Sequence, residues 1–246
     1  MSFWTKTRSS RRSPPALPDC IDILHKWNAW EKTPESIRSH LLNGCEDSEN
    51  MRIDEFEALG NRFFGLVFKD STVYPAVRNK AKELGYNCIM LSEYQCAEAR
   101  EAGYVDSAMA LCAERMGEPF KAPIVLMSSG ENLVTVGSEC GIGGRNQEYC
   151  IASAINIAGS EKIVVGAVDT DGTDGPGGLK LEGAPECLAG AIVDGYTFGE
   201  AKAAGIDLWD GLKTHGTSAP LWKLDCGVSA EYNVSALDLR VILIME

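Results

Sequence analysis

The sequence predicts an α/β fold of three layers, in which a mostly parallel or mixed sheet is flanked by helices. Short apolar runs, which are typical of buried strands, occur at residues 63–68, 86–91, 123–127 and 163–168. Stretches with apolar residues at helical spacing alternate with these runs, and this alternation is typical of α/β proteins. With 246 residues and 45% hydrophobic content, the chain is large enough to bury a core.

The composition excludes several classes of partner. A net charge of -12 argues against wide contact with nucleic acid or an anionic membrane, because both require a basic face. No apolar run approaches the roughly 18 residues of a spanning helix, and no apolar segment follows the basic start as in a secretory signal. We therefore expect a cytoplasmic protein. The nine cysteines are scattered without a Cys-x-x-Cys pair, so we expect reduced thiols, mostly in the core, rather than a zinc site.

The N-terminal residues 1–18 carry four basic side chains and no acidic one, which predicts a disordered basic arm. A transit peptide has a similar composition, but no amphipathic face is visible here. Two helices are expected next, over residues 21–30 and 34–42, the second with Pro34 in its first turn. A polar linker follows at residues 43–51.

A βαβ unit is expected next. Its strands are the apolar runs at 63–68 and 86–91, and its helix covers residues 73–84, with Gly85 in the helix-ending position. A further helix over residues 97–116 and a strand over residues 123–127 continue the alternation.

A glycine-rich region connects that strand to the next helix. Residues 128–131 predict a polar turn, residues 133–136 a hairpin partner, and residues 137–144 a loop with four glycines before a helix that starts near Asn146. A helix N-terminus attracts anions. Arg145 is therefore a candidate ligand for a phosphate or carboxylate, and the alternative is an Arg145–Glu148 pair that only fastens the helix end.

A run of aspartates follows the apolar strand at 163–168, which we interpret as a buried parallel strand. Asp171 and Asp174 offer two carboxylates at the strand's carboxyl end, where open α/β sheets bind ligands. An EF-hand is excluded, because neither possible start places glycine sixth. The alternative is a turn in which these side chains bond the local backbone. Together, the glycine loop and the aspartates suit a phosphate held with a divalent metal.

Four motifs resemble, in order and spacing, the MOFRL domain of ATP-dependent glycerate 2-kinases, some of which carry the older label hydroxypyruvate reductase. They are Gly143-Gly-Arg-Asn-Gln-Glu148, Thr170-Asp-Gly-Thr-Asp-Gly-Pro176, Ala189-Gly-Ala-Ile-Val-Asp194 and Asp238-Leu-Arg-Val-Ile-Leu-Ile244. The resemblance implies a MOFRL-like domain over residues 121–246. Weaker similarity implies a partial kinase-domain-like α/β region over residues 19–120.

The resemblance also implies an activity, the transfer of the ATP γ-phosphoryl group to the 2-hydroxyl of D-glycerate with Mg2+, in a cleft between two α/β domains. Arg145 would neutralise charge on the substrate, and Asp171 and Asp174 would hold magnesium or orient the acceptor hydroxyl. The other substrate-binding or phosphate-binding residues expected are Ser128, Ser129, Gly130, Glu131, Gly143, Gly144, Asn146, Glu148, Thr170, Gly172 and Asn233.

Members of the family carry an upstream phosphate loop and a lysine that have no counterpart here, so a separate N-terminal kinase half is an expected partner. One alternative is a non-catalytic remnant that binds an anion or a partner protein. Another is a hydroxypyruvate reductase, although Asn146 stands where a Gly-x-Gly-x-x-Gly fingerprint needs its third glycine. His215 is interpreted as a loop histidine with satisfied hydrogen bonds, or as a residue lining the cleft.

Overall fold

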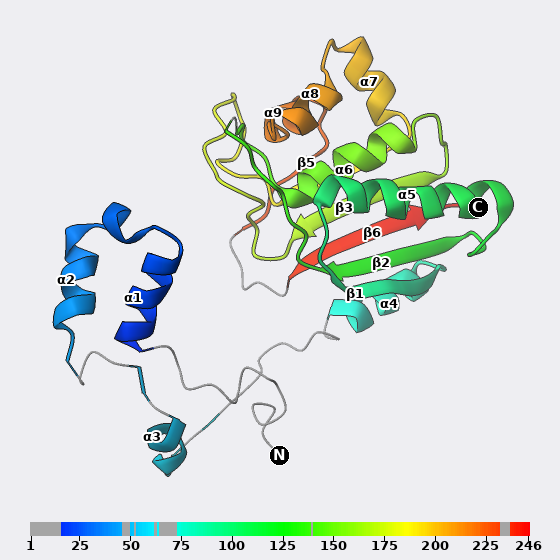
Figure 1. The fold of residues 1–246 in the computed structure, drawn as a ribbon. Helices are drawn as coiled ribbons and strands as arrows, with labels where there is room; N and C mark the ends of the chain where they lie inside the picture. The colour runs from blue at the N-terminus through cyan, green and yellow to red at the C-terminus, as the bar shows by residue number, and fades with distance from the viewer. Residues whose placement is uncertain are drawn as a thin grey trace. The chain divides into compact units, whose positions relative to one another are not determined.

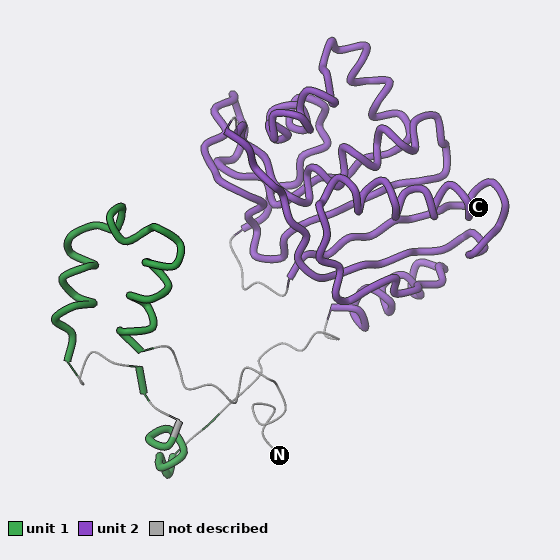
Figure 2. Tube along the Cα trace, viewed as in Figure 1, with its two compact units in different colours: residues 1–66 green, residues 67–246 purple. Residues whose placement is uncertain are grey.

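The computed structural model describes residues 16–45, 50–51, 53–61, 63, 73–138, 140–231 and 237–246. The chain forms two compact units, Met1–Leu66 and Val67–Glu246 (Figure 2). Most of the predicted basic arm, almost all of the predicted strand at 63–68, and Asn233 lie outside the described residues. The domain boundaries after residues 18 and 120 stay predictions.

The first unit consists of short helices with little burial. Its elements are α1 (Leu17–Lys26), η3 (Trp30–Lys32), α2 (Glu35–Asn43) and α3 (Ile53–Ala58). The helix expected at 21–30 begins earlier and ends at Lys26, whereas the second expected helix is confirmed as α2. Neither α1 nor α2 has a buried residue, and Trp27 and Leu42 are 72% and 63% exposed. These helices therefore present apolar side chains that nothing within the described part of their unit covers.

The second unit is built on a six-stranded mixed sheet, which confirms the predicted fold class (Figure 1). Its strands are β1 (Asn87–Gln95), β2 (Ile124–Gly130), β3 (Ile163–Asp169), β4 (Gly190–Asp194), β5 (Gly227–Val228) and β6 (Asp238–Ile244), in the order β1-β2-β6-β3-β4-β5. Among these six strands, only β1 and β2 pair in parallel. The prediction of a parallel strand at 163–168 was wrong in its pairing. The strand β3 runs in the same direction as β2, but β6 inserts between them, and both neighbours of β3 are antiparallel to it.

Helices cover the sheet on its two sides. They are α4 (Val73–Glu83), α5 (Ala99–Met116), α6 (Arg145–Asn156), α7 (Thr197–Ala203), α8 (Leu208–Lys213) and α9 (Ser218–Lys223). Figure 1 shows α5 and α6 side by side over one face and α4 beside β1 on the opposite side. A Cβ added to Gly103 of α5 would collide with the carbonyl of Tyr149, so glycine permits the close approach of α5 to α6.

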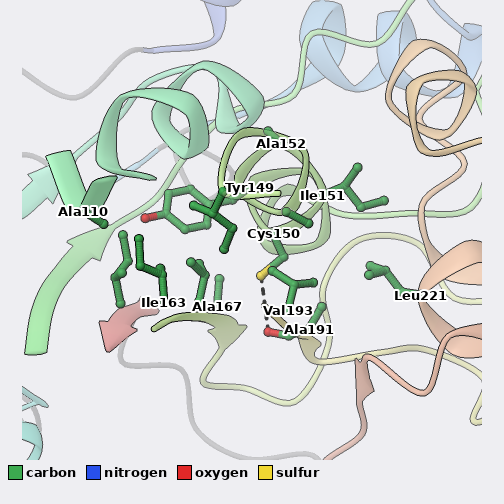
Figure 3. Packing of buried hydrophobic residues seen from close by; sticks show 14 of the residues in the cluster. Ala110, Tyr149, Cys150, Ile151, Ala152, Ile163, Ala167, Ala191, Val193 and Leu221 are labelled. Carbon is green, nitrogen blue, oxygen red and sulfur yellow. Dashed lines mark hydrogen bonds between the residues drawn. The ribbon is translucent and has the colours of Figure 1, made fainter. Parts of the chain in front are cut away.

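The core lies between the sheet and α6. Along β3 and β6 every second residue is buried, and Ile163, Val165 and Ile242 pack in the same apolar cluster as Tyr149 and Ile151 of α6 (Figure 3). Fully burying such a side chain contributes about 1.5–3 kcal/mol, so this contact fixes the position of α6 on the sheet. Cys150 is the only fully buried cysteine, so the expectation that most thiols lie in the core was wrong.

The polar region after the expected strand at 123–127 differs from its prediction. Ser128, Ser129 and Gly130 continue β2 instead of forming a turn, because they pair with the start of β6. The predicted hairpin partner at 133–136 is not a strand, and Leu133 forms only an isolated bridge with Glu98. The helix at 73–84, the strand at 86–91 and the helix at 97–116 are confirmed as α4, β1 and α5. Within the described residues, no helix has the length and apolarity needed to cross a bilayer.

Candidate functional site

The glycine loop before α6 lies against the aspartate segment. A Cβ added to Gly144 would collide with the backbone and carboxylate of Asp174, and one added to Gly143 would collide with Thr217. Glycine at these two positions therefore permits three chain segments to approach one another closely. The structure brings the two polar segments together at the carboxyl ends of β2 and β3.

The N-terminus of α6 is capped by Asp174. One carboxylate oxygen accepts hydrogen bonds from the backbone and side-chain nitrogens of Asn146, both at 3.1 Å, and the other accepts the backbone N–H of Gln147 at 2.9 Å. Asp174 is 1% exposed, and this burial raises the pKa of its carboxyl to about 6. The anion held at this helix end is thus a side chain of the protein itself.

Arg145 connects the ends of two neighbouring strands. Its Nε lies 2.9 and 3.1 Å from the two oxygens of Asp238, and its Nη2 lies 2.5 Å from Asp169. Both carboxylates are almost fully buried, whereas the Arg145 side chain remains 23% exposed. Burial alone would lower the pKa of Arg145, but the neighbouring aspartates raise it above its ordinary value. The structure therefore holds a permanently charged guanidinium that is fixed on one side and open on the other.

Asp169 and Asp238 were not predicted as site residues. Asp169 ends β3, Asp238 begins β6, and the antiparallel register places the two directly opposite each other. Asp238 is the first residue of the last family motif, and Asp169 directly precedes the motif that begins at Thr170. Their proximity nevertheless depends on the pairing of two strands, since the two aspartates are 69 residues apart in sequence. Arg240 supports the pair from within the core, with its Nη1 3.1 Å from Asp238.

Asp171 lies in a local turn. Its Oδ1 accepts hydrogen bonds from the backbone N–H and the hydroxyl of Thr173, both at 2.8 Å. Thr170 donates its hydroxyl to the carbonyl of Leu237 at 2.8 Å, and Gly172 adopts a positive φ of 93°. This is the arrangement of the local Asp-Gly turn that the sequence left open as an alternative.

The described residues do not fit a resident magnesium ion. Both oxygens of Asp174 already accept N–H groups, so this buried carboxylate is not open to a cation. Asp171 engages only one oxygen in the hydrogen bonds of the described residues. No group of three or more His, Cys, Asp or Glu side chains suited to a metal occurs among those residues. The predicted roles of Asp171 and Asp174 in metal binding thus lack support from this arrangement.

Glu148 pairs with His215. The carboxylate oxygen lies 2.7 Å from Nδ1 of the imidazole, and Glu148 is 2% exposed, so burial raises its pKa. The alternative of an Arg145–Glu148 ion pair is therefore wrong, because Glu148 pairs with His215. The glutamate that lies near Arg145 is Glu131, whose carboxylate is 3.6 Å from the guanidinium. His215 thus has one ring nitrogen satisfied.

The predicted ligand residues of β2 point into the protein. Ser128 Oγ accepts a hydrogen bond from Arg240 at 3.3 Å, and Ser129 Oγ donates to the carbonyl of Asp238 at 2.8 Å. Both serines are buried, and Gly130 packs against the backbone of Gln95. The two serines therefore contact Arg240 and Asp238 of the Arg145 network, and a contact of Ser128, Ser129 or Gly130 with substrate stays a prediction.

Comparisons with known proteins show which family the chain resembles. Residues 124–231 match the MOFRL family. A glycerate 2-kinase from Pyrococcus horikoshii is 35% identical over 216 residues, which cover 87% of this chain and 46% of the relative. A putative hydroxypyruvate reductase from Agrobacterium vitis is 31% identical over 94% of this chain and 49% of its own length.

A solved structure is also similar. The glycerate kinase of Thermotoga maritima superimposes with a TM-score of 0.71 at 30% identity, over 93% of this chain and 50% of that structure. The chain therefore spans about half the length of the relatives it matches. From the motifs, the fold and these matches together, we conclude that the chain carries a domain of the MOFRL family and is related to the glycerate 2-kinases.

Proposed function

We propose that the chain forms part of an ATP-dependent kinase that phosphorylates the 2-hydroxyl of D-glycerate. The observation that carries the proposal is Arg145, which two buried carboxylates fix in place while part of its side chain stays open. A fixed, charged donor suits a substrate carboxylate or the oxygens of a phosphoryl group in transfer. The similarity to proteins named glycerate 2-kinase supports the same activity.

Arg145 is not sufficient for such a site. Asp169 and Asp238 accept its hydrogen bonds, and Arg240 is the only other cation that pairs with either carboxylate among the described residues. A triphosphate carries several negative charges, and phosphoryl transfer depends on neutralising them. Further cations or hydrogen-bond donors are therefore needed from outside the Arg145 network.

We propose that the other half of the catalytic unit supplies them, on the same or on a separate polypeptide. The relatives are about twice as long as the matched region. Within the first unit, α1 and α2 leave Ile23, Trp27, Ile37 and Leu42 at least 48% exposed. Apolar helix faces of this kind mark interaction surfaces, and we assign them to contact with the other half of the catalytic unit.

ATP, when bound, would supply the γ-phosphoryl group, and magnesium would partly neutralise its charge. Because the described residues do not fit a resident magnesium ion, we expect the metal to enter with the nucleotide. Among the carboxylates that pair with Arg145 in the described residues, Glu131 is the most exposed, at 61% of its side chain, and is therefore the one most open to such a complex. Arg145 would bind and orient the substrate carboxylate or the transferred group.

The proposal is tested by measuring ADP formation with ATP, Mg2+ and D-glycerate. The chain would be assayed alone and mixed with the N-terminal half of the Thermotoga maritima relative, with reactions lacking D-glycerate as controls. We expect D-glycerate-dependent ADP formation in the mixture and a product phosphorylated at position 2 by 31P NMR. NADH oxidation with hydroxypyruvate, in place of ADP formation, would instead establish the reductase.

A further inference from the structure

A cavity of about 340 Å3 lies between α5 and α8, and none of its residues belongs to the Arg145 network. Its volume is within the range of small-molecule sites. The cavity is lined by Arg100, Glu101 and Tyr104 from α5 and by Trp209, Leu212 and Lys213 from α8.

The apolar part of the cavity is aromatic. The rings of Tyr104 and Trp209 have centroids 6.3 Å apart and planes inclined by 26°. Trp209 is 53% exposed although it is a large apolar side chain, while Leu212 is buried. The exposed indole ring of Trp209 provides a face on which a flat ring can stack.

The charged part of the cavity is basic. Arg100 and Lys213 contribute two positive charges and Glu101 one negative charge, in a protein of net charge -12. The ion pair between Arg100 and Glu101, at 3.4 Å, is solvent-exposed and therefore weak. Lys213 forms none of the ion pairs found in the described part of the chain. Arg100 also interacts electrostatically with Glu98 and Glu148, so the excess of positive charge is confined to the lining side chains, where Lys213 is the cation most available to an anion.

Both walls of the cavity are anchored. Asp207 caps α8 by accepting the backbone N–H of Trp209 at 2.9 Å and that of Asp210 at 3.2 Å. On the other wall, the carbonyl of Tyr104 accepts a hydrogen bond from Asn156 of α6. Anchored walls reduce the entropy lost when a ligand binds.

We propose that this cavity binds a nucleotide, with its base on Trp209 and a phosphate between Arg100 and Lys213. The combination of a stacking face with two cations matches a flat heteroaromatic ring that carries a negative group. A nucleoside monophosphate satisfies these requirements. Because the cavity shares no residue with the Arg145 network, this inference does not depend on the proposed kinase activity.

The test uses AMP as the probe and the full chain, with binding measured by calorimetry and by tryptophan fluorescence. Trp209→Ala should weaken AMP binding about tenfold, as expected for the loss of one stacked base. Lys213→Gln should weaken it about fivefold, and Lys180→Gln, an exposed lysine elsewhere in the same unit, should leave it unchanged. Circular dichroism would establish that the variants keep their fold.

Adenosine and inorganic phosphate separate the two parts of the ligand, and each should bind at least fivefold more weakly than AMP. Phosphate binding as tightly as AMP would show a simple anion site and overturn the proposal, as would adenosine binding equally well. Unchanged affinity in Trp209→Ala, or no binding of AMP to the unmodified chain at millimolar concentration, would also overturn it.

Discussion

Replacing Asp174 with alanine tests how the N-terminus of α6 is held. The change removes the acceptor for three nitrogen donors, the backbone N–H groups of Asn146 and Gln147 and the side-chain amide of Asn146. Each buried donor left without a partner costs about 1–3 kcal/mol. The loss is therefore about 6 kcal/mol before any compensation.

The compensation comes from the carboxylate itself. Burial raises the pKa of Asp174 from 3.8 to about 6, and this shift corresponds to about 3 kcal/mol of penalty on the charged form. Removing the side chain also removes that penalty. We therefore expect Asp174→Ala to lower the free energy of unfolding by about 3 kcal/mol at pH 7.

The pH dependence has a definite sign. Because the folded-state pKa is raised, the proton on Asp174 contributes stability that is fully present below pH 3.8 and is lost as the pH rises through about 6. The unmodified protein should gain about 1 kcal/mol from this group between pH 7 and pH 5, and the variant cannot. The difference in the free energy of unfolding between the unmodified protein and Asp174→Ala should thus become larger toward pH 5.

Urea unfolding followed by circular dichroism at pH 7 and pH 5 measures both quantities. Asp171→Ala is the matched control, because Asp171 stands in the same segment but accepts only hydrogen bonds within its own turn. We expect the control to cost about 1 kcal/mol or less. A loss below 1 kcal/mol for Asp174→Ala, or a difference that narrows toward pH 5, would refute the reasoning.

Three further predictions concern stability and can be measured by the same unfolding assay. Asp238→Asn should destabilise the protein by about 3–5 kcal/mol, because it leaves Arg240 without its buried counter-charge and removes one of the two buried counter-charges of Arg145; a cost below 1 kcal/mol would contradict this. Gly144→Ala should cost about 1–3 kcal/mol through its collision with Asp174, and an unchanged midpoint would show that the loop can move. Tyr104→Phe should leave stability unchanged or raise it by about 1 kcal/mol, because the buried hydroxyl has no hydrogen-bond partner among the described residues; a marked loss would indicate an unseen partner.

Helices with a clear apolar pattern could be predicted from the sequence. The helices α4 and α5 appear close to their expected bounds because propensity and periodicity agree over several turns. The antiparallel pairing of β3 could not be predicted, since a short apolar run does not specify its neighbours. Its partner β6 is the last strand of the chain, and only the folded sheet shows that the two pair. The extension of β2 through Ser128, Ser129 and Gly130 was hidden because these residues lack the apolar side chains that mark a buried strand.

The candidate site was predicted only in part. The segments that carry Arg145 and Asp174 were identified from their glycines and charges, and the structure places them together. The residues that directly bind Arg145 were missed, because Asp169 and Asp238 meet through strand register rather than through a local motif. Local spacing reveals which groups could act, whereas pairing over long sequence distances determines which groups meet.

The central claim is that Arg145, fixed by Asp169 and Asp238, is the cation that binds the reacting substrate. The most direct test is kcat/KM for D-glycerate in the reconstituted catalytic unit with Arg145→Met, compared with Arg115→Met, a change at an exposed arginine of α5. We predict a decrease of about 100-fold or more for Arg145→Met and no change for Arg115→Met. An Arg145→Met enzyme with unaltered kcat/KM would contradict the account.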